Sequence, residues 1–171
     1  MNKFLIKLLL TAFLGCSITA VSQEKEISLD IHKMMKPLQK DGIFRDSLYY
    51  NWGGSIIKDE DGIYHLFYSR WKRAYTFNGW LTFSEIAHAE SNAATGPWKY
   101  KETVLKGSGQ GNWDEITAHN PKIKYFEGKY YLYYIATNLG GKNFTNDDLV
   151  ALSTKSLKDA DRGTLRKNQR T

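Results

Sequence analysis

An internal repeat constrains this chain more than any other feature of its sequence. Residues 57–68 (IKDEDGIYHLFY) align without a gap with residues 123–134 (IKYFEGKYYLYY), at an offset of 66 positions. Each copy has the pattern of a strand, a tight turn and a second strand. The pairs Asp61-Gly62 and Glu127-Gly128 supply the turns, because glycine tolerates the positive φ that a tight hairpin requires. A chain that contains such repeated hairpins is predicted to be all-β.

The first copy is followed by two further strand candidates. They are Leu81–Glu90 and Trp98–Leu105, separated by the turn-forming cluster Asn92–Pro97. The second strand of each hairpin carries aromatic residues on both faces, so both faces are expected to be covered. Four antiparallel strands in one repeat are the content of one propeller blade, which needs stacked neighbours to bury its faces.

The second copy runs into a polar stretch, and the chain stops at Thr171 before two more strands are complete. Propellers have four to eight blades. We therefore expect residues 48–171 to be a partial propeller domain, with about the first one and a half blades present. A small complete β-sandwich is the alternative.

The N-terminal segment has the pattern of an export signal. Residues 1–22 carry Lys3 and Lys7 ahead of the apolar run Leu8–Val21, and small residues follow where signal peptidase cleaves. The sequence therefore predicts a signal peptide over residues 1–22 and a secreted or periplasmic protein. Residues 23–47 are interpreted as a linker and lead-in.

Cys16 gives a second interpretation of the same segment. The run Phe13–Cys16 is a loose lipobox, which would make the protein an outer-membrane lipoprotein, and lipidation of Cys16 is the only membrane attachment expected. Because Cys16 is the sole cysteine, disulfides and cysteine-based zinc sites are excluded. The four histidines have no regular spacing, so no metal site is predicted. His65 is assigned a structural role, while His32 and His88 have no visible partners.

Net charge does not indicate a nucleic-acid partner. The chain has 24 Lys and Arg against 18 Asp and Glu, and much of the excess lies after Thr154. No basic face is interleaved with stacking aromatics, so this tail is predicted to be a solvated loop.

Several of these segments resemble the first two blades of five-bladed propeller glycoside hydrolases of family 43 and its relatives, including family 117. The resemblance implies a carbohydrate substrate and no redox cofactor, and some relatives hold calcium in the central channel. It rests on the following runs: Gly54–Ile57, Asp61–Ser69, Ala87–Ser91, Gly96–Trp98, His119–Ile123 and Gly128–Tyr134.

Glycoside hydrolysis uses two carboxyl groups across the scissile bond. The resemblance places the catalytic base of family 43 in an Asp-Pro pair ahead of the first strand, where this chain has Gly53-Gly54. The acid would lie in a later blade. Asp114, beside a tryptophan at the start of the second repeat, and Glu85, within an apolar run, are the catalytic candidates. Asp46 is a weaker substitute for the missing base.

Residues near strand ends are the candidates for sugar binding. Aromatic rings stack on sugar faces, adjacent glycines admit a ligand to the backbone, and polar side chains bond hydroxyl groups. These candidates are Asn51, Trp52, Arg70, Trp113, His119 and Asn120. Each also has a plain structural interpretation as a turn, packing or capping residue.

The sequence leaves three functions open. The first is a glycoside hydrolase acting on a polysaccharide or oligosaccharide, truncated and inactive as this fragment. The second is a non-catalytic carbohydrate-binding or surface-interaction propeller, which the glycine at position 53 favours. The third is a fragment with neither activity.

Overall fold

The structure is a computed structural model that describes residues 29–37, 40–140 and 142–154. The chain divides into two units, Met1–Pro37 and Leu38–Thr171. The predicted signal peptide and the basic tail lie outside the described residues. In the first unit the short helix α2 (Ile31–Met34) begins at Asp30, whose side chain accepts a hydrogen bond from the Lys33 amide. No helix in the described part of the chain is long and apolar enough to cross a membrane.

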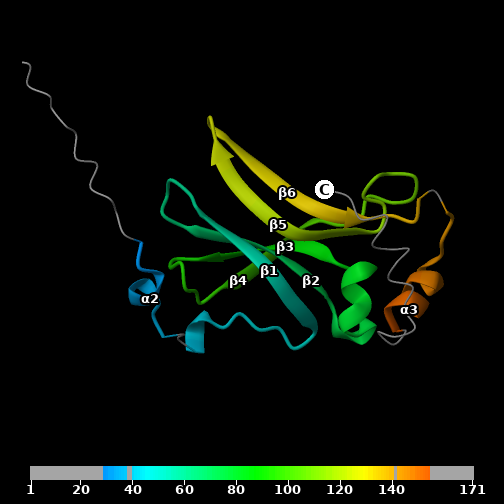
Figure 1. Cartoon of the computed structure of the whole chain (residues 1–171), viewed down its shortest axis with the longest axis horizontal. Helices are drawn as coiled ribbons and strands as arrows, with labels where there is room; N and C mark the ends of the chain where they lie inside the picture. The colour runs from blue at the N-terminus through cyan, green and yellow to red at the C-terminus, as the bar shows by residue number, and fades with distance from the viewer. Residues whose placement is uncertain (1–28, 38–39, 141, 155–171) are drawn as a thin grey trace, which may run out of the picture. The chain divides into compact units, whose positions relative to one another are not determined.

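The second unit is mostly sheet, which agrees with the all-β expectation. A short 3-10 helix, η1 (Lys40–Gly42), precedes the first strand. The strands β1 (Tyr49–Lys58), β2 (Tyr64–Lys72), β3 (Glu85–Ser91) and β4 (Lys99–Leu105) then form one antiparallel sheet in chain order (Figure 1). The prediction of four antiparallel strands after the lead-in is therefore confirmed.

The expected strand over Leu81–Glu90 is wrong at its start. The segment before Glu85 forms the 3-10 helices η2 (Arg73–Tyr75) and η3 (Phe77–Leu81) instead. Thr76 separates them with a φ of 57°, and its hydroxyl accepts a hydrogen bond from the next turn. This local capping competes with extended backbone, and the apolar composition gave no sign of it.

The second repeat forms a separate two-stranded sheet from β5 (Thr117–Phe126) and β6 (Lys129–Thr137). Its turn is the residue pair Glu127-Gly128, with φ of 48° and 76°, as in a type I′ hairpin. The first hairpin instead has the longer loop Asp59–Ile63, closed by a hydrogen bond from the Ile63 amide to the Asp59 carboxylate.

The two hairpins differ in register by one residue because of these turns. Ile57 lies opposite His65, whereas the equivalent Ile123 lies opposite Leu132 rather than Tyr131. Directly opposite residues of an antiparallel pair lie on the same face. The shift therefore places Tyr131, the equivalent of His65, on the opposite face from Ile123. The sequence repeat is therefore not an exact structural repeat.

The second hairpin packs across one face of the four-stranded sheet (Figure 1). Serine hydroxyls of the first sheet accept hydrogen bonds from β5 amides: Ser69 from Asn120 at 2.7 Å, and Ser55 from Ile123 at 3.2 Å. The opposite face of the sheet carries its own core, made of Leu66, Tyr68, Ala87 and Ala89 with Phe44 and Trp98 packed against it.

The helix α3 (Asn146–Thr154) closes the described part of the chain. It packs against η3, and the Thr76 hydroxyl donates a hydrogen bond to the Ser153 carbonyl at 2.7 Å. This contact fixes the loop that carries Phe77, a residue of the candidate site below.

Candidate functional site

Two β-bulges, one within β1 and one within β5, lie where the two repeats meet. Gly53-Gly54 lie opposite Tyr68 in the first hairpin, and Asn120-Pro121 lie opposite Tyr134 in the second. Gly53 has a φ of +50°, and a Cβ atom there would lie only 2.7 Å from the Asn120 Oδ1 atom. The positive φ favours glycine at position 53, and the absence of a side chain there leaves room for the Asn120 amide.

Exposed aromatic rings lie beside this contact. The side chains of Trp52 and Phe77 are 53% and 46% exposed, and their ring centroids are 5.8 Å apart in an edge-to-face arrangement. Tyr50 and Trp71 support Phe77 from below, each with its ring centroid 5.9 Å away. We call Trp52 and Phe77 the aromatic platform. Trp71, which is 1% exposed, anchors it through a hydrogen bond from its indole nitrogen to the Thr76 carbonyl.

His119 lies beneath the surface, next to the platform support. Its ring is within 5.9 Å of Trp71 and 5.3 Å of Trp80, and its Nδ1 atom is 2.7 Å from the Ser84 hydroxyl. Burial lowers the pKa of His119 to about 4, so the ring is neutral at neutral pH. Its neighbour Asn120 is exposed, so of these two predicted binding residues only Asn120 reaches the surface.

Asp114 is buried and engaged on both carboxylate oxygens. The Ser108 hydroxyl donates to Oδ1, and the Tyr134 hydroxyl donates to Oδ2 at 2.8 Å. Burial, together with the hydrogen bond and negative charge of Asp114, raises the pKa of Tyr134 to about 12. Asp114 therefore anchors the loop before β5 onto β6 in this structure.

A pocket of about 390 Å³ opens next to Tyr134. Trp113, which is 44% exposed, forms one side, with its ring 5.3 Å from that of Tyr134. Asn120 belongs to this pocket as well as to the contact with Gly53. The lining residues include no carboxylate: Trp113, Asn120, Lys122, Leu132, Tyr133, Tyr134 and Ile135.

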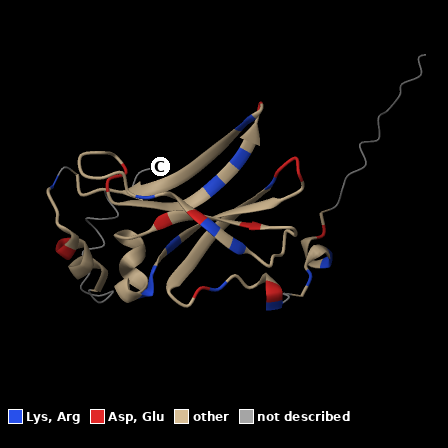
Figure 2. Ribbon diagram, turned by 180° about the vertical axis from the view of Figure 1, so that it is seen from behind, with Lys and Arg blue, Asp and Glu red and all other residues tan. Residues whose placement is uncertain are grey.

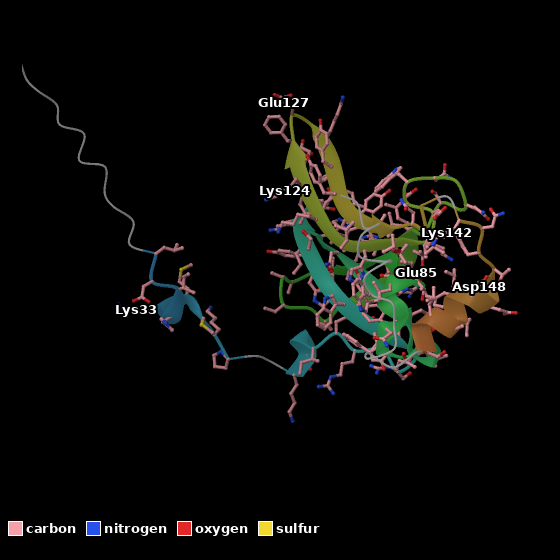
Figure 3. All side chains as sticks on the ribbon, turned by 45° about the vertical axis from the view of Figure 1, so that its right-hand side comes forward. Lys33, Glu85, Lys124, Glu127, Lys142 and Asp148 are labelled. Atoms are coloured by element: carbon pink, nitrogen blue, oxygen red, sulfur yellow. The ribbon has the colours of Figure 1, made fainter. Side chains whose placement is uncertain are left out.

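Glu85 and Arg70 lie together on the other face of the four-stranded sheet. The Arg70 Nε atom donates to Glu85 Oε1 at 2.7 Å, and the Thr103 hydroxyl donates to the same oxygen at 2.9 Å. The guanidinium group lies between the rings of Tyr49 and Tyr100, 4.4 and 4.2 Å from their centroids. Figure 3 shows Glu85 far from the hairpin tip that carries Glu127. The pair is a buried structural contact between β2, β3 and β4.

Asn51 and Asp46 make hydrogen bonds that hold the segment before β1. Asn51 follows the alternation of the strand, so its side chain points away from the face that carries Trp52 and donates to the Phe44 carbonyl at 3.4 Å. The Asp46 carboxylate accepts hydrogen bonds from the amides of Leu48 and Tyr49 and thereby caps the start of β1.

The sequence interpretation missed two features. Phe77 was not recognised because it lies in an unexpected 3-10 helix. The view that His88 has no partner is wrong: its Nε2 atom is 2.9 Å from His65 Nδ1, and His65 Nε2 is 2.9 Å from the Asp59 carboxylate. The register of β2 against β3, which the sequence does not specify, brings His65 and His88 together.

Comparison with known proteins gives partial structural similarity only. No protein-family model matches the chain, and no curated protein matches it. Among solved structures, it is similar to Zg3597, a family 117 glycoside hydrolase from the marine bacterium Zobellia galactanivorans. The identity is 24%, over 53% of this chain and 30% of that one, with a TM-score of 0.43.

A thermostable family-43 glycoside hydrolase is a second similar structure. Its identity is 21%, over 60% of this chain and 31% of that one, with a TM-score of 0.37. The match thus spans about a third of the length of either hydrolase.

Proposed function

We propose that this protein binds an oligosaccharide at the aromatic platform, as a non-catalytic relative of the five-bladed propeller glycoside hydrolases that its motifs resemble. The observation that carries the proposal is the exposed pair Trp52 and Phe77 beside Asn120. Sugar rings present polarised C–H groups that suit the negative face of an aromatic ring. A nearby amide supplies the hydrogen bonds that fix the orientation of a ligand.

Neighbouring residues hold the two rings of the platform in place. Trp52 lies next to the glycine bulge of β1, and Phe77 is fixed by Trp71 and by the contact of Thr76 with α3. Rigid aromatic side chains lose little conformational entropy when a ligand stacks on them.

The carboxylate geometry favours binding over cleavage. Hydrolysis needs an acid and a base or nucleophile facing one glycosidic bond. Asp114 is held by Ser108 and Tyr134, Glu85 is held by Arg70 and Thr103, and position 53 is glycine. None of the hydrogen-bond partners of these two carboxylates is a residue of the platform.

Calorimetric titration with a panel of plant and algal oligosaccharides tests this proposal. We expect at least one to bind, and the Trp52→Ala variant to bind it about tenfold more weakly, a loss of about 1.4 kcal/mol. Tyr130→Ala is the matched control, because Tyr130 is 54% exposed but lies at the tip of the second hairpin. Equal weakening by both substitutions would contradict a site at the platform.

Hydrolysis is the second candidate, and one observation favours it: Asp114 accepts a hydrogen bond from Tyr134, which lines the Trp113 pocket. Release of reducing sugar by the wild-type protein, abolished in Asp114→Asn, would establish this activity and overturn the non-catalytic proposal. We expect no release from either protein.

A further inference from the structure

Three potential metal ligands meet on one face of the four-stranded sheet. His65 lies on β2 opposite Glu90 on β3, and His88 lies two residues before Glu90 on the same face. His65 Nδ1 and His88 Nε2 are 2.9 Å apart, and Glu90 Oε1 is 3.9 Å from each of them. All three atoms belong to adjacent, paired strands, so the sheet itself holds them in place.

The size of this triangle fits a small transition-metal ion. Three atoms at these separations share a point about 2.1 Å from each, which matches Zn–N and Zn–O bond lengths.

The ring nitrogens that face away from the triangle, His65 Nε2 and His88 Nδ1, each lie near a carboxylate. His65 Nε2 is 2.9 Å from the Asp59 carboxylate, and His88 Nδ1 is 3.6 Å from the Glu102 carboxylate. A carboxylate favours the N–H on the ring nitrogen that faces it, which leaves the lone pair on the inner nitrogen. Without a cation, the 2.9 Å contact between the inner nitrogens is a hydrogen bond that needs a proton on one of them. A bound cation would take the place of that proton.

We infer that His65, His88 and Glu90 bind a divalent ion of the zinc class, with Asp59 and Glu102 as positioning residues. Two imidazoles and one carboxylate suit zinc, whereas calcium and magnesium prefer oxygen ligands throughout. Glu90 is partly exposed, so a water molecule completes the coordination. This site is separate from the aromatic platform, since it lies at the end of the sheet next to the Asp59–Ile63 loop.

Lys101 should lower the affinity of this site for a metal ion. Its ammonium group is 2.9 Å from Glu90 Oε2, which leaves Oε1 for the ion. The ammonium group also repels an incoming cation at short range. Replacing Lys101 should therefore tighten metal binding, an effect that a purely structural salt bridge would not produce.

Calorimetric titration of the whole chain with zinc chloride, after chelator treatment, tests the inference. Cys16→Ser is present in every sample, because that thiol would bind zinc independently. We expect one ion per chain and an increase in melting temperature with zinc concentration. His88→Gln should abolish both, and His32→Gln, which alters a histidine outside the cluster, should change neither.

Two milder variants keep the test decisive if His88→Gln fails to fold. Asp59→Asn retains the acceptor for the Ile63 amide but loses the charge facing His65, and we expect 10–100-fold weaker binding. Lys101→Met should bind more tightly than the parent. Absence of zinc binding in the folded parent protein would overturn the inference and leave a hydrogen bond from His88 to His65 as the only link between the rings. Unchanged affinity in both milder variants would overturn it as well.

Discussion

The two copies of the hairpin motif have different surroundings. In the first, Leu66 and Tyr68 are 9% and 3% exposed, because β3 and the lead-in cover them. Their equivalents Leu132 and Tyr134 are only partly buried. The second hairpin extends beyond the first sheet, and Figure 3 shows Glu127 and Lys124 at its free end. Its large exposed residues are Tyr125, Phe126, Tyr130, Tyr131 and Tyr133, from 39% to 62% exposed.

The repeated motif therefore specifies a hairpin but not how deeply the hairpin is buried. A blade-like sheet is stabilised by the elements stacked on it, and β5–β6 has such a neighbour along only one face in the described part of the chain. Basic residues also mark β5 (Figure 2), among them Lys122 and Lys124. The proposed sugar site and the proposed metal site both include residues of the first sheet, Trp52 in the first case and His65, His88 and Glu90 in the second.

The comparison predicts very different costs for removing an aromatic residue from each region. Trp71→Ala should lower the free energy of unfolding by about 3–5 kcal/mol, because it empties a fully buried site. Tyr133→Ala, at a position 61% exposed, should change it by less than about 0.5 kcal/mol. Urea unfolding followed by far-UV circular dichroism measures both. Equal costs would show that the second hairpin is as well buried as the first sheet.

The buried Arg70–Glu85 pair should contribute the next largest effect. Glu85→Ala leaves the guanidinium group without its carboxylate, and we expect a loss of about 3 kcal/mol in the same unfolding assay. The exposed pair Lys101–Glu90 is the matched control, and Lys101→Ala in chelator should cost at most about 1 kcal/mol. Similar losses for the two pairs would contradict the assigned difference in burial.

His119 links the two regions and predicts a pH dependence. Its folded-state pKa is about 4, below the usual 6.5, so the unfolded chain takes up a proton first as pH falls. Stability should therefore be unaffected by this group above pH 6.5 and should decrease from there down to about pH 4. At pH 5 the loss from this residue should be about 2 kcal/mol. The His119→Gln variant should show a flatter profile between these limits in thermal melts, whereas an unchanged profile would argue against a buried neutral ring.

The glycine bulge where the repeats meet should give the smallest effect. Gly53→Ala places a methyl group against Asn120 Oδ1 in a backbone conformation unfavourable for alanine. We expect a loss of about 1–2 kcal/mol. Gly128→Ala, which has positive φ but open space around it, separates backbone strain from the contact. A cost for Gly53→Ala no larger than for Gly128→Ala would mean that the contact with Asn120 is not tight.

Local turn chemistry explains why much of the fold was predictable. The acidic-glycine pairs predict both hairpins, although only Glu127-Gly128 forms the expected tight turn, since the first hairpin has the loop Asp59–Ile63. Short runs of aromatic and β-branched residues between turn-forming residues predict most strand positions. The one-residue register difference and helix η3 depend on loop length and on capping by Thr76, which the repeat does not encode.

The site was less predictable because partners decide the role of a polar residue. The sequence places Trp52 and Asn120 near strand ends, which is wrong: both lie within strands, at the bulges, and near one another through Gly53. Asp114 and Glu85 have the right chemistry for catalysis, but tertiary contacts engage both. The histidine cluster required the exact pairing of two strands.

The most direct test of the account is an amide NMR titration of the labelled protein with a binding oligosaccharide. We predict shifts at Trp52, Gly53, Phe77 and Asn120, including the Trp52 indole, with little change at Tyr130. Shifts confined to the aromatic residues of β5 and β6, with none at the platform, would contradict it.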